Sequence, residues 1–332
     1  MLESPSFIRL RLDYAPGVDV LSDVIAVART GRPRSALVRW HAPWGQRFAS
    51  VPGSAGFQVV VEGSCHRTSS AGEGTVLRTG DVLFLPHGNG HTLGDTPASA
   101  PTAPACEATD SRFAEPFTTD RIRPPRGDGP VTSVLCGAYQ LEPSRTHPLL
   151  RGLPEFIHLP AHAGRRPELD PAVHLLAHEL EHRRPGTDSA VPALLDLLIL
   201  YILREWFAQE PARQTTTGWA AALNDPTITA ALNAMHRDPA APWTVAALAN
   251  EAGRSRAAFA RRFTDLVGQP PLGYLTWWRM TTAARLLKTT DAPLRTVANQ
   301  VGYASEFAFA NAFKRTHHTA PGKFRAQNDQ AT

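Results

Sequence analysis

One pattern occurs twice in the last third of the 332-residue chain, and it constrains the fold more than any other feature. In the first copy, an apolar run over 245–249 leads to Gly253, and Ser255 then precedes a run that carries Phe259 and Phe263. Glycine tolerates the positive φ of a tight turn, and serine commonly caps the N-terminus of a helix. The pattern therefore predicts two short helices joined by a tight turn, a helix-turn-helix.

The second copy repeats the pattern with Gly302, Ser305, Phe309 and Phe313, and its turn is one residue longer. Between the copies, 271–289 has the apolar spacing of one continuous helix. A connecting helix that holds both second helices on one face would let them enter major-groove segments about one helical turn, roughly 34 Å, apart. The repeat therefore predicts contact with two adjacent segments of double-stranded DNA.

Side chains opposite the buried phenylalanines are the ones expected to face DNA, because a helix has 3.6 residues per turn. Arg, Asn, Glu and apolar side chains can recognise guanine, adenine, cytosine and the thymine methyl group, respectively. For each residue taken singly, the alternative is an ordinary solvent-exposed helix face. The predicted DNA-facing residues are Arg256, Ala257, Ala260 and Arg261 in the first copy, and Glu306, Phe307, Ala310, Asn311 and Lys314 in the second.

Several motifs follow one another in this region in a fixed order. They are Trp243-Thr244-Val245, Gly268-Gln269-Pro270-Pro271, Tyr274-Leu275 with Trp278-Arg279-Met280, Val301-Gly302-Tyr303, and Ala320-Pro321-Gly322 with Phe324-Arg325. In these motifs the region resembles the DNA-binding domain of AraC/XylS-type transcriptional regulators. One departure is Ala310-Asn311, where many similar proteins carry a Ser-Arg pair, and it leaves the base preference of the second helix open. The resemblance implies a sequence-specific regulator whose partners are double-stranded DNA and RNA polymerase.

Charge is distributed unevenly along the chain, whose formal net charge is +4. Residues 212–332 contain 14 Lys and Arg against 7 Asp and Glu, and they include all three lysines. Attraction to DNA phosphates is therefore expected from the C-terminal part. No apolar run approaches the roughly 18 residues of a membrane helix, and the first residues lack a signal-peptide pattern. We therefore expect a cytoplasmic protein with no membrane partner.

The N-terminal half contains short β-like runs separated by Gly, Ser and Pro, which predict a small barrel or jelly roll. The segment from Gly80 to His91 has the form G-x5-P-x-G-x2-H and resembles the second sequence motif of cupin barrels. Metal-binding cupins also need a His-x-His and a Glu from an earlier motif. The corresponding region, 53–63, has no histidine and offers Gln58 and Glu62 instead.

We therefore expect the barrel to hold an organic ligand of unknown identity, or to be a degenerate pocket with a structural role. No cofactor is expected. The alternative is a metal held by histidines in another geometry, with His41, His66, His87 and His91 as ligands. The candidate pocket residues are His41, Gln58, His87 and His91.

The three cysteines, Cys65, Cys106 and Cys136, have no C-x-x-C spacing and cannot all pair within one chain. This argues for reduced thiols and against a disulfide scaffold. Oxidation of one of these thiols is a second possible signal, although a buried structural cysteine is the commoner case.

The sequence His178-Glu179-Leu180-Glu181-His182 is a literal H-E-x-x-H, the signature of zinc metalloproteases. Together with His174, these histidines lie opposite Leu176 on a predicted helix, so we expect them to face solvent and the motif to be a chance occurrence. The alternative in a different functional class is a metal-dependent enzyme with an accessory nucleic-acid domain.

The chain is thus predicted to be an α+β protein that acts as a homodimer. The predicted order is a cupin-like sensor domain over 1–165, a helical dimerisation segment over 166–210, a linker over 211–222, and a DNA-binding domain over 223–328 with an N-cap at Asp225. Further expectations are a helix at 20–28, strands at 36–41 and 131–140, a long loop at 96–130, and a strongly apolar helix at 190–208. That helix is expected to pack either against the barrel or against a second subunit.

Overall fold

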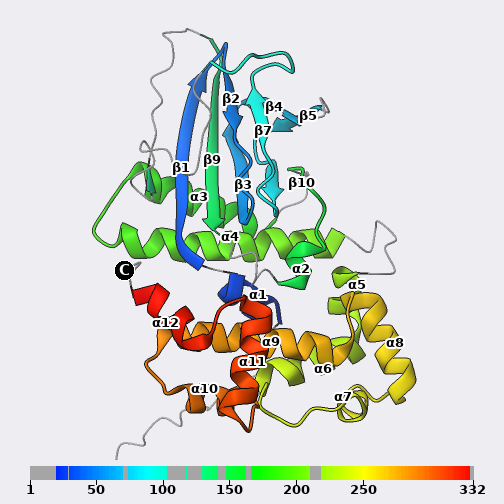
Figure 1. Ribbon diagram of the computed structural model, residues 1–332. Helices are drawn as coiled ribbons and strands as arrows, with labels where there is room; N and C mark the ends of the chain where they lie inside the picture. The colour runs from blue at the N-terminus through cyan, green and yellow to red at the C-terminus, as the bar shows by residue number, and fades with distance from the viewer. Residues whose placement is uncertain are drawn as a thin grey trace, which may run out of the picture.

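The computed structural model describes residues 20–28, 30–69, 74–102, 117–118, 129–140, 147–161, 166–209 and 218–329. A β-rich N-terminal domain occupies the upper part of Figure 1, and a helical C-terminal domain occupies the lower part. The helix α1 (Val20–Ala28), although first in the chain, lies where the two domains meet.

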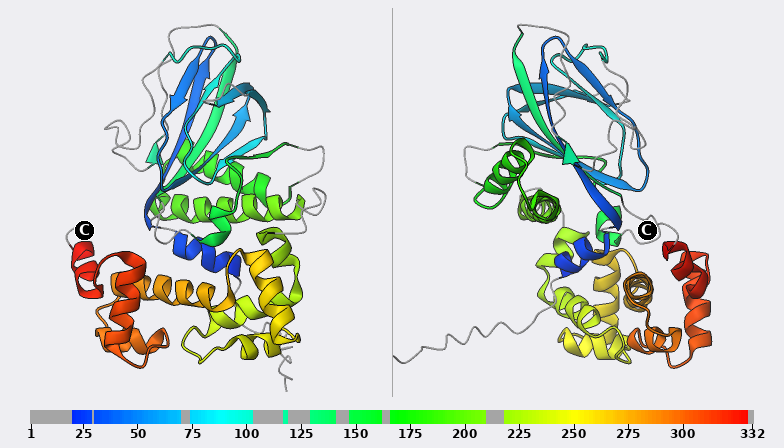
Figure 2. Two further views of the ribbon diagram at one scale, coloured as in Figure 1. Left: turned by 45° about the vertical axis from the view of Figure 1, so that its right-hand side comes forward. Right: turned by 90° about the vertical axis from the view of Figure 1, so that its left-hand side faces the viewer.

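Two sheets form the N-terminal domain and face each other (Figure 2). The larger has the order β10-β6-β3-β9-β1-β8, and the smaller has the order β2-β7-β4-β5. All described pairings are antiparallel except that of β1 with β8. The strands are β1 (Thr30–His41), β2 (Gly45–Phe48), β3 (Ser54–Glu62), β4 (Ser64–Ser69), β5 (Gly74–Arg78), β6 (Val82–Leu85), β7 (His91–Gly94), β8 (Phe117–Thr118), β9 (Val131–Gln140) and β10 (Ile157–Leu159).

Alternating side chains of the larger sheet belong to two different cores, as expected for a strand buried on both faces. In β9, Val134 joins the apolar core between the two sheets, whereas Leu135 joins the core on the outer face. Between the sheets, Trp40 and Trp44 stack with ring centroids 4.4 Å apart. Two helices, α3 (Leu169–Glu181) and α4 (Thr187–Gln209), cover the outer face.

The remaining helices belong to the C-terminal domain, apart from the short α2, which follows the barrel. They are α2 (Pro148–Arg151), α5 (Trp219–Asn224), α6 (Pro226–Arg237), α7 (Val245–Glu251), α8 (Arg256–Val267), α9 (Pro271–Thr289), α10 (Leu294–Gln300), α11 (Glu306–His317) and α12 (Pro321–Asp329). The long helix α9 connects the two helix-turn-helix units, α7–α8 and α10–α11.

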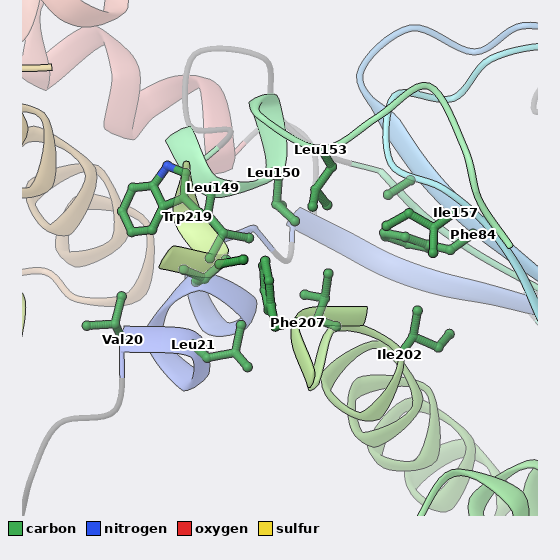
Figure 3. Close-up of a cluster of buried hydrophobic side chains, with 14 of the residues drawn as sticks. Val20, Leu21, Phe84, Leu149, Leu150, Leu153, Ile157, Ile202, Phe207 and Trp219 are labelled. Carbon is green, nitrogen blue, oxygen red and sulfur yellow. The ribbon is translucent and has the colours of Figure 1, made fainter. Parts of the chain in front are cut away.

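One apolar core extends from the outer face of the barrel through the domain boundary into the first helix-turn-helix unit. At the boundary, Leu21 of α1, Leu149 of α2, Phe207 of α4 and Trp219 of α5 are all buried in it (Figure 3). The second unit has a separate core, which in the described chain draws only on residues between Met280 and Phe324. The barrel is thus packed continuously with the first unit, and α9 carries the connection onward.

Several predicted elements have the bounds that the sequence indicated. The helices 20–28 and 271–289 and the strand 131–140 are confirmed, and the predicted strand 36–41 is the C-terminal half of β1. The apolar helix predicted at 190–208 is α4, and it packs against the barrel, the first of the two alternatives.

Other expectations need correction. The segment 96–130 was predicted to be a loop throughout, but Phe117–Thr118 forms β8 and pairs in parallel with Ser35–Ala36 of β1. A two-residue strand leaves no periodicity in the sequence, so only its tertiary pairing reveals it. The range 211–222, predicted to be a linker, contains helical residues from Trp219 onward, and α5 packs against α6 and α8.

Candidate nucleic-acid interface

The first helix-turn-helix unit is built from local capping interactions. The Thr244 hydroxyl accepts a hydrogen bond from the Ala247 amide at 3.0 Å at the start of α7, and the Ser255 hydroxyl accepts one from Ala258 at 3.4 Å at the start of α8. Gly253, with a φ of 63°, forms the turn between them. These interactions satisfy amides that helix termini leave without partners.

The second unit repeats this construction. The Ser305 hydroxyl accepts a hydrogen bond from the Ala308 amide at 3.4 Å at the start of α11, and Gly302 takes a φ of 78° in the turn. A Cβ atom at Gly302 would lie 2.9 Å from the carbonyl oxygen of Ala240, so this turn lies close to the segment that leads into α7. As predicted, its turn is one residue longer than the first.

Paired phenylalanines anchor both second helices in the same way. The rings of Phe259 and Phe263 are 5.6 Å apart at an interplanar angle of 54°, and those of Phe309 and Phe313 are 5.7 Å apart at 55°. All four side chains are buried. This repeated geometry fixes which face of α8 and which face of α11 turns away from the core.

The two units are also joined by a polar contact. Arg279 of α9 donates hydrogen bonds to the carbonyl oxygens of Pro239 at 2.7 Å and Ala241 at 2.8 Å, in the segment that leads into α7. Its guanidinium group also lies 6.0 Å from the ring centroid of Tyr303, in the second turn. One side chain of the connecting helix therefore contacts both the segment that leads into α7 and the turn of the second unit.

The predicted DNA-facing residues all lie on the outward faces of α8 and α11. Ala260 and Ala310 are half-buried, and the others are exposed, with Phe307 the most exposed large apolar side chain of the described residues at 77%. The exposed members are Arg256, Ala257, Arg261, Glu306, Phe307, Asn311 and Lys314.

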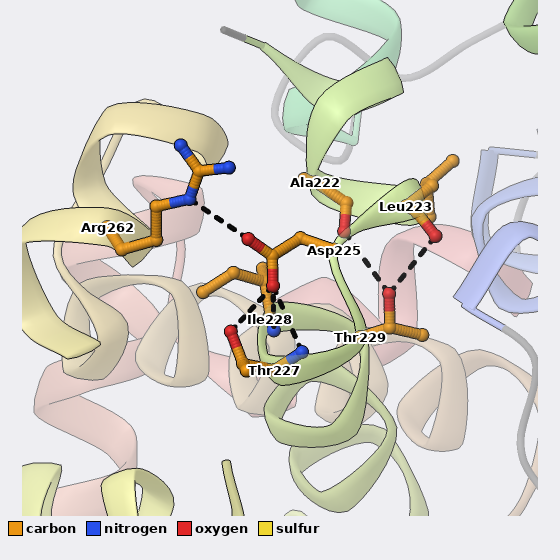
Figure 4. A network of polar contacts seen from close by, with 7 residues as sticks. All are labelled: Ala222, Leu223, Asp225, Thr227, Ile228, Thr229 and Arg262. Carbon is orange, nitrogen blue, oxygen red and sulfur yellow. Dashed lines mark hydrogen bonds and ion pairs between the residues drawn. The ribbon is translucent and has the colours of Figure 1, made fainter. Parts of the chain in front are cut away.

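Asp225 anchors α8 to the start of α6 (Figure 4). As predicted, it caps α6, accepting hydrogen bonds from the amides of Thr227 at 3.0 Å and Ile228 at 3.3 Å. It also pairs with Arg262 of α8, whose Nε lies 2.9 Å from the carboxylate. The pairing with Arg262 could not be predicted, because it depends on how α6 and α8 pack.

Of the four predicted pocket residues, the structure brings Gln58 and His91 together. The Nε2 atom of His91 lies 2.8 Å from Oε1 of Gln58, and burial lowers the pKa of His91 to about 4. His91 is therefore neutral at pH 7 and donates this hydrogen bond. His87 instead contacts the carbonyl oxygen of Leu153 at 2.9 Å, and His41 lies at the end of β1. Within the described ranges, no group of three His, Cys, Asp or Glu residues is placed to hold a metal ion.

The cysteines lie in different environments. Cys65 is buried between the two sheets, and burial raises the pKa of its thiol to about 12, so the reactive thiolate is disfavoured. Cys136 is half-buried, and Cys106 lies outside the described residues.

The H-E-x-x-H sequence lies at the C-terminal end of α3, with His182 as the residue that follows the helix. As expected, His174, His178 and His182 are exposed. Glu179 accepts hydrogen bonds from the Thr187 hydroxyl at 2.6 Å and from Arg184 at 3.0 Å. Both contacts lower the pKa of Glu179. This carboxylate therefore stabilises the turn between α3 and α4, a structural role that accounts for its position.

No helix in the described parts of the chain combines the length and the apolar character needed to cross a membrane. The fold as a whole joins a double-sheet barrel to a pair of helix-turn-helix units. Residues 19–208 match the family model described as Cupin, and residues 248–327 match the one described as Helix-turn-helix domain. The chain is therefore a cupin domain followed by a DNA-binding domain.

Relatives over nearly the full length define the family. The chain is 33% identical over 309 residues to a Streptomyces lividans protein named as an AraC-like transcription regulator, covering 93% of this chain and 98% of that protein. It is 30% identical over 272 residues to the HTH-type transcriptional regulator AlkR of Acinetobacter baylyi, and this match covers 81% of this chain and 87% of AlkR. It is also 28% identical over 297 residues to the RCS-specific HTH-type transcriptional activator RclR of Escherichia coli, and this match covers 89% of this chain and 86% of RclR. This chain belongs to the AraC family of DNA-binding transcription regulators.

Proposed function

We propose that this regulator reads two adjacent major-groove segments of one duplex with α8 and α11, and that a signal received by the cupin domain changes the placement of these helices. The observation that carries the proposal is the repeated geometry of the two phenylalanine pairs, which exposes equivalent faces of both helices. A change of placement requires the signal to interact differently with two arrangements of the protein.

Specific roles follow from side-chain chemistry. Arg261 is suited to bind guanine bidentately, Asn311 to bind adenine, and Phe307 to contact a thymine methyl group. Arg256, Glu306 and Lys314 extend the same surfaces, and the small side chains Ala257, Ala260 and Ala310 allow close approach of the helices to the bases. Lys323, exposed on α12, is suited to bind a phosphate.

A small organic ligand in the barrel is the favoured signal. The indole Nε1 of the buried Trp44 has no hydrogen-bond acceptor among the described residues, and a ligand oxygen would supply one. The neutral His91 and Gln58 add polar atoms to the same domain. Thiol oxidation is the second candidate signal. It is disfavoured at Cys65 by burial, which leaves Cys106 and the half-buried Cys136 to be tested by serine substitution under oxidant.

We also propose that two copies associate through the outward face of α4 and that the dimer contacts RNA polymerase at its promoters. Ala193, Leu197, Tyr201 and Arg204 follow one another at three- and four-residue spacing, and Leu197 is 39% exposed. Leu197→Arg is expected to give a monomer in analytical ultracentrifugation. Leu272→Arg, at a leucine of α9 that is 41% exposed, serves as the matched control and should leave the mass unchanged. A monomeric wild type would contradict the dimer.

DNA recognition can be tested by selecting duplexes from a random library with the full-length protein. We expect enriched sequences with two preferred segments about 10 base pairs apart. Arg261→Ala should relax the preference at one position, whereas Arg183→Ala, at an exposed arginine between α3 and α4, should leave every position unchanged. Enrichment of no sequence, or an unchanged preference in Arg261→Ala, would refute the proposed contacts.

A further inference from the structure

A buried chain of polar side chains crosses the boundary between the cupin domain and the first helix-turn-helix unit. The boundary is formed by α1 and α2 on one side and by α5, α6 and α9 on the other, and α1 contacts α4, α6 and α9. The apolar core is continuous here, so polar groups require partners within the protein.

Four side chains, those of Asp23, His236, Tyr274 and His147, are joined by successive hydrogen bonds. The carboxylate of Asp23 in α1 lies 2.8 Å from Nδ1 of His236 in α6. The other ring nitrogen of His236 lies 2.6 Å from the hydroxyl of Tyr274 in α9. That hydroxyl also lies 3.0 Å from Nε2 of His147, the residue that precedes α2. Finally, Nδ1 of His147 accepts a hydrogen bond from the amide of Leu149 at 3.0 Å.

These contacts define where each proton lies. Since Nδ1 of His147 accepts from an amide, the proton of the neutral ring is on Nε2 and is donated to the Tyr274 oxygen. The Tyr274 hydroxyl therefore donates its own proton to Nε2 of His236. His236 must then carry its proton on Nδ1, and this is donated to the Asp23 carboxylate. Every N–H or O–H donor of these four side chains thus has an acceptor, and each hydrogen bond between them is donated in the direction from His147 toward Asp23.

The surroundings exclude water from most of these side chains and keep His147 and Tyr274 in their neutral forms. The side chains of His147, His236 and Tyr274 are buried, and only Asp23, at 24% exposure, reaches solvent. Burial, helped by His236 and Arg151, lowers the pKa of His147 well below its usual value. Burial, helped by Asp23, raises the pKa of Tyr274 well above its usual value.

Aromatic rings pack around the two histidines. Trp278 stacks on His236 with centroids 3.9 Å apart, and Trp219 and Trp277 meet His147 edge-on at 5.0 and 4.9 Å. Because water is excluded, loss of one member would leave its neighbours as buried, unpaired polar groups.

We propose that the Asp23–His236–Tyr274–His147 chain is a latch that fixes the first helix-turn-helix unit to the cupin domain and communicates the state of that domain to α8. This role rests on the proposed function as a regulator. The latch holds α6 and the first half of α9, both packed with the first unit, whereas the second unit has its own core. A signal that separates α1 or α2 from this site would therefore act first on α8, and on α11 only through α9.

The latch can be tested in the full-length protein by amide hydrogen exchange followed by mass spectrometry. Tyr274→Phe keeps the ring but removes the hydroxyl that joins the two histidines, and Asp23→Ala removes the final acceptor. Tyr303→Phe is the matched control, because this tyrosine lies in the second unit and outside the latch. We expect exchange in α1 and α2 to accelerate on the order of tenfold or more in both latch variants, with α10 and α11 unchanged.

Unchanged exchange in α1 and α2 in both variants would overturn the proposal. Equal acceleration in α10 and α11 would also overturn it, since that would indicate a general loss of stability. The result is independent of DNA recognition. If the protein selected no DNA sequence, the proposed function would be refuted and this measurement would still test the latch. If the protein selected DNA but the latch variants left exchange in α1 and α2 unchanged, only the latch would be refuted.

Discussion

Replacing Asp225 with alanine would show how firmly α8 is held in the first unit. One carboxylate oxygen caps α6 through the amides of Thr227 and Ile228, and the other accepts a hydrogen bond from Arg262 of α8 (Figure 4). Asp225→Ala removes both contacts at once. Arg262→Ala removes only the second, which makes it the matched comparison.

The magnitude follows from the two contacts. Loss of an N-cap costs about 1 kcal/mol, and the ion pair contributes about 0.5 kcal/mol because the Arg262 side chain is 49% exposed. Although burial alone would raise it, the hydrogen bonds from Thr227, Arg262 and Ile228 lower the pKa of Asp225. A lowered carboxyl pKa means that this stabilisation is present above the unfolded value, about 3.9, and is lost as the pH falls below it.

Amide hydrogen exchange of α6 and α8 in the full-length protein at pH 7 measures these energies locally. We expect Asp225→Ala to accelerate exchange about tenfold and Arg262→Ala about twofold, with the double variant close to Asp225→Ala alone. If the two single variants had equal effects, the capping role of Asp225 would be wrong.

Three further predictions concern other parts of the chain. Gly302→Ala should destabilise the protein more than Gly253→Ala in thermal unfolding, because both glycines have positive φ but a Cβ only at the former would meet backbone within 3 Å; equal losses would contradict the close packing of the second turn. Lys323→Ala should weaken binding to all DNA sequences alike and lower the salt slope by about 1, whereas Arg261→Ala should change base preference; the reverse pattern would refute these roles. Since burial lowers the pKa of His91 to about 4 from 6.5, its protonation favours unfolding, and stability of the cupin domain should fall by about 3 kcal/mol as the pH falls from 6.5 to 4. Urea unfolding at the two pH values should show a smaller loss of stability in His91→Gln than in the wild type. An equal loss in both proteins would assign the acid sensitivity to other groups.

Much of the DNA-binding domain could be predicted because its determinants are local. Gly253, Ser255 and the spacing of Phe259 and Phe263 specify a turn, a cap and a buried face within a few residues of one another. The outward positions, including Arg261, follow from helical geometry alone. Their exposure agrees with the sequence, and contact with DNA stays a prediction.

The latch and much of the barrel could not be predicted, because they depend on contacts between distant segments. Asp23 and His236 are 213 residues apart, and neither stands in a motif that indicates the other. The short strands β2, β4 and β7 contain too few residues for an alternation of apolar and polar side chains to be recognised in the sequence. Among the candidate pocket residues, the cupin-like motif drew attention to His91 and His87 alike, but it gave no sign that His87 contacts the carbonyl oxygen of Leu153.

The central claim is that α8 and α11 contact neighbouring turns of one duplex. Methylation interference on a duplex selected by the full-length protein tests it most directly, because methylation at guanine N7 blocks contacts in the major groove. We expect two clusters of interfering guanines about 10 base pairs apart on one side of the helix, with Arg261→Ala losing interference in only one of them. A single cluster, or two clusters on opposite sides of the duplex, would contradict it.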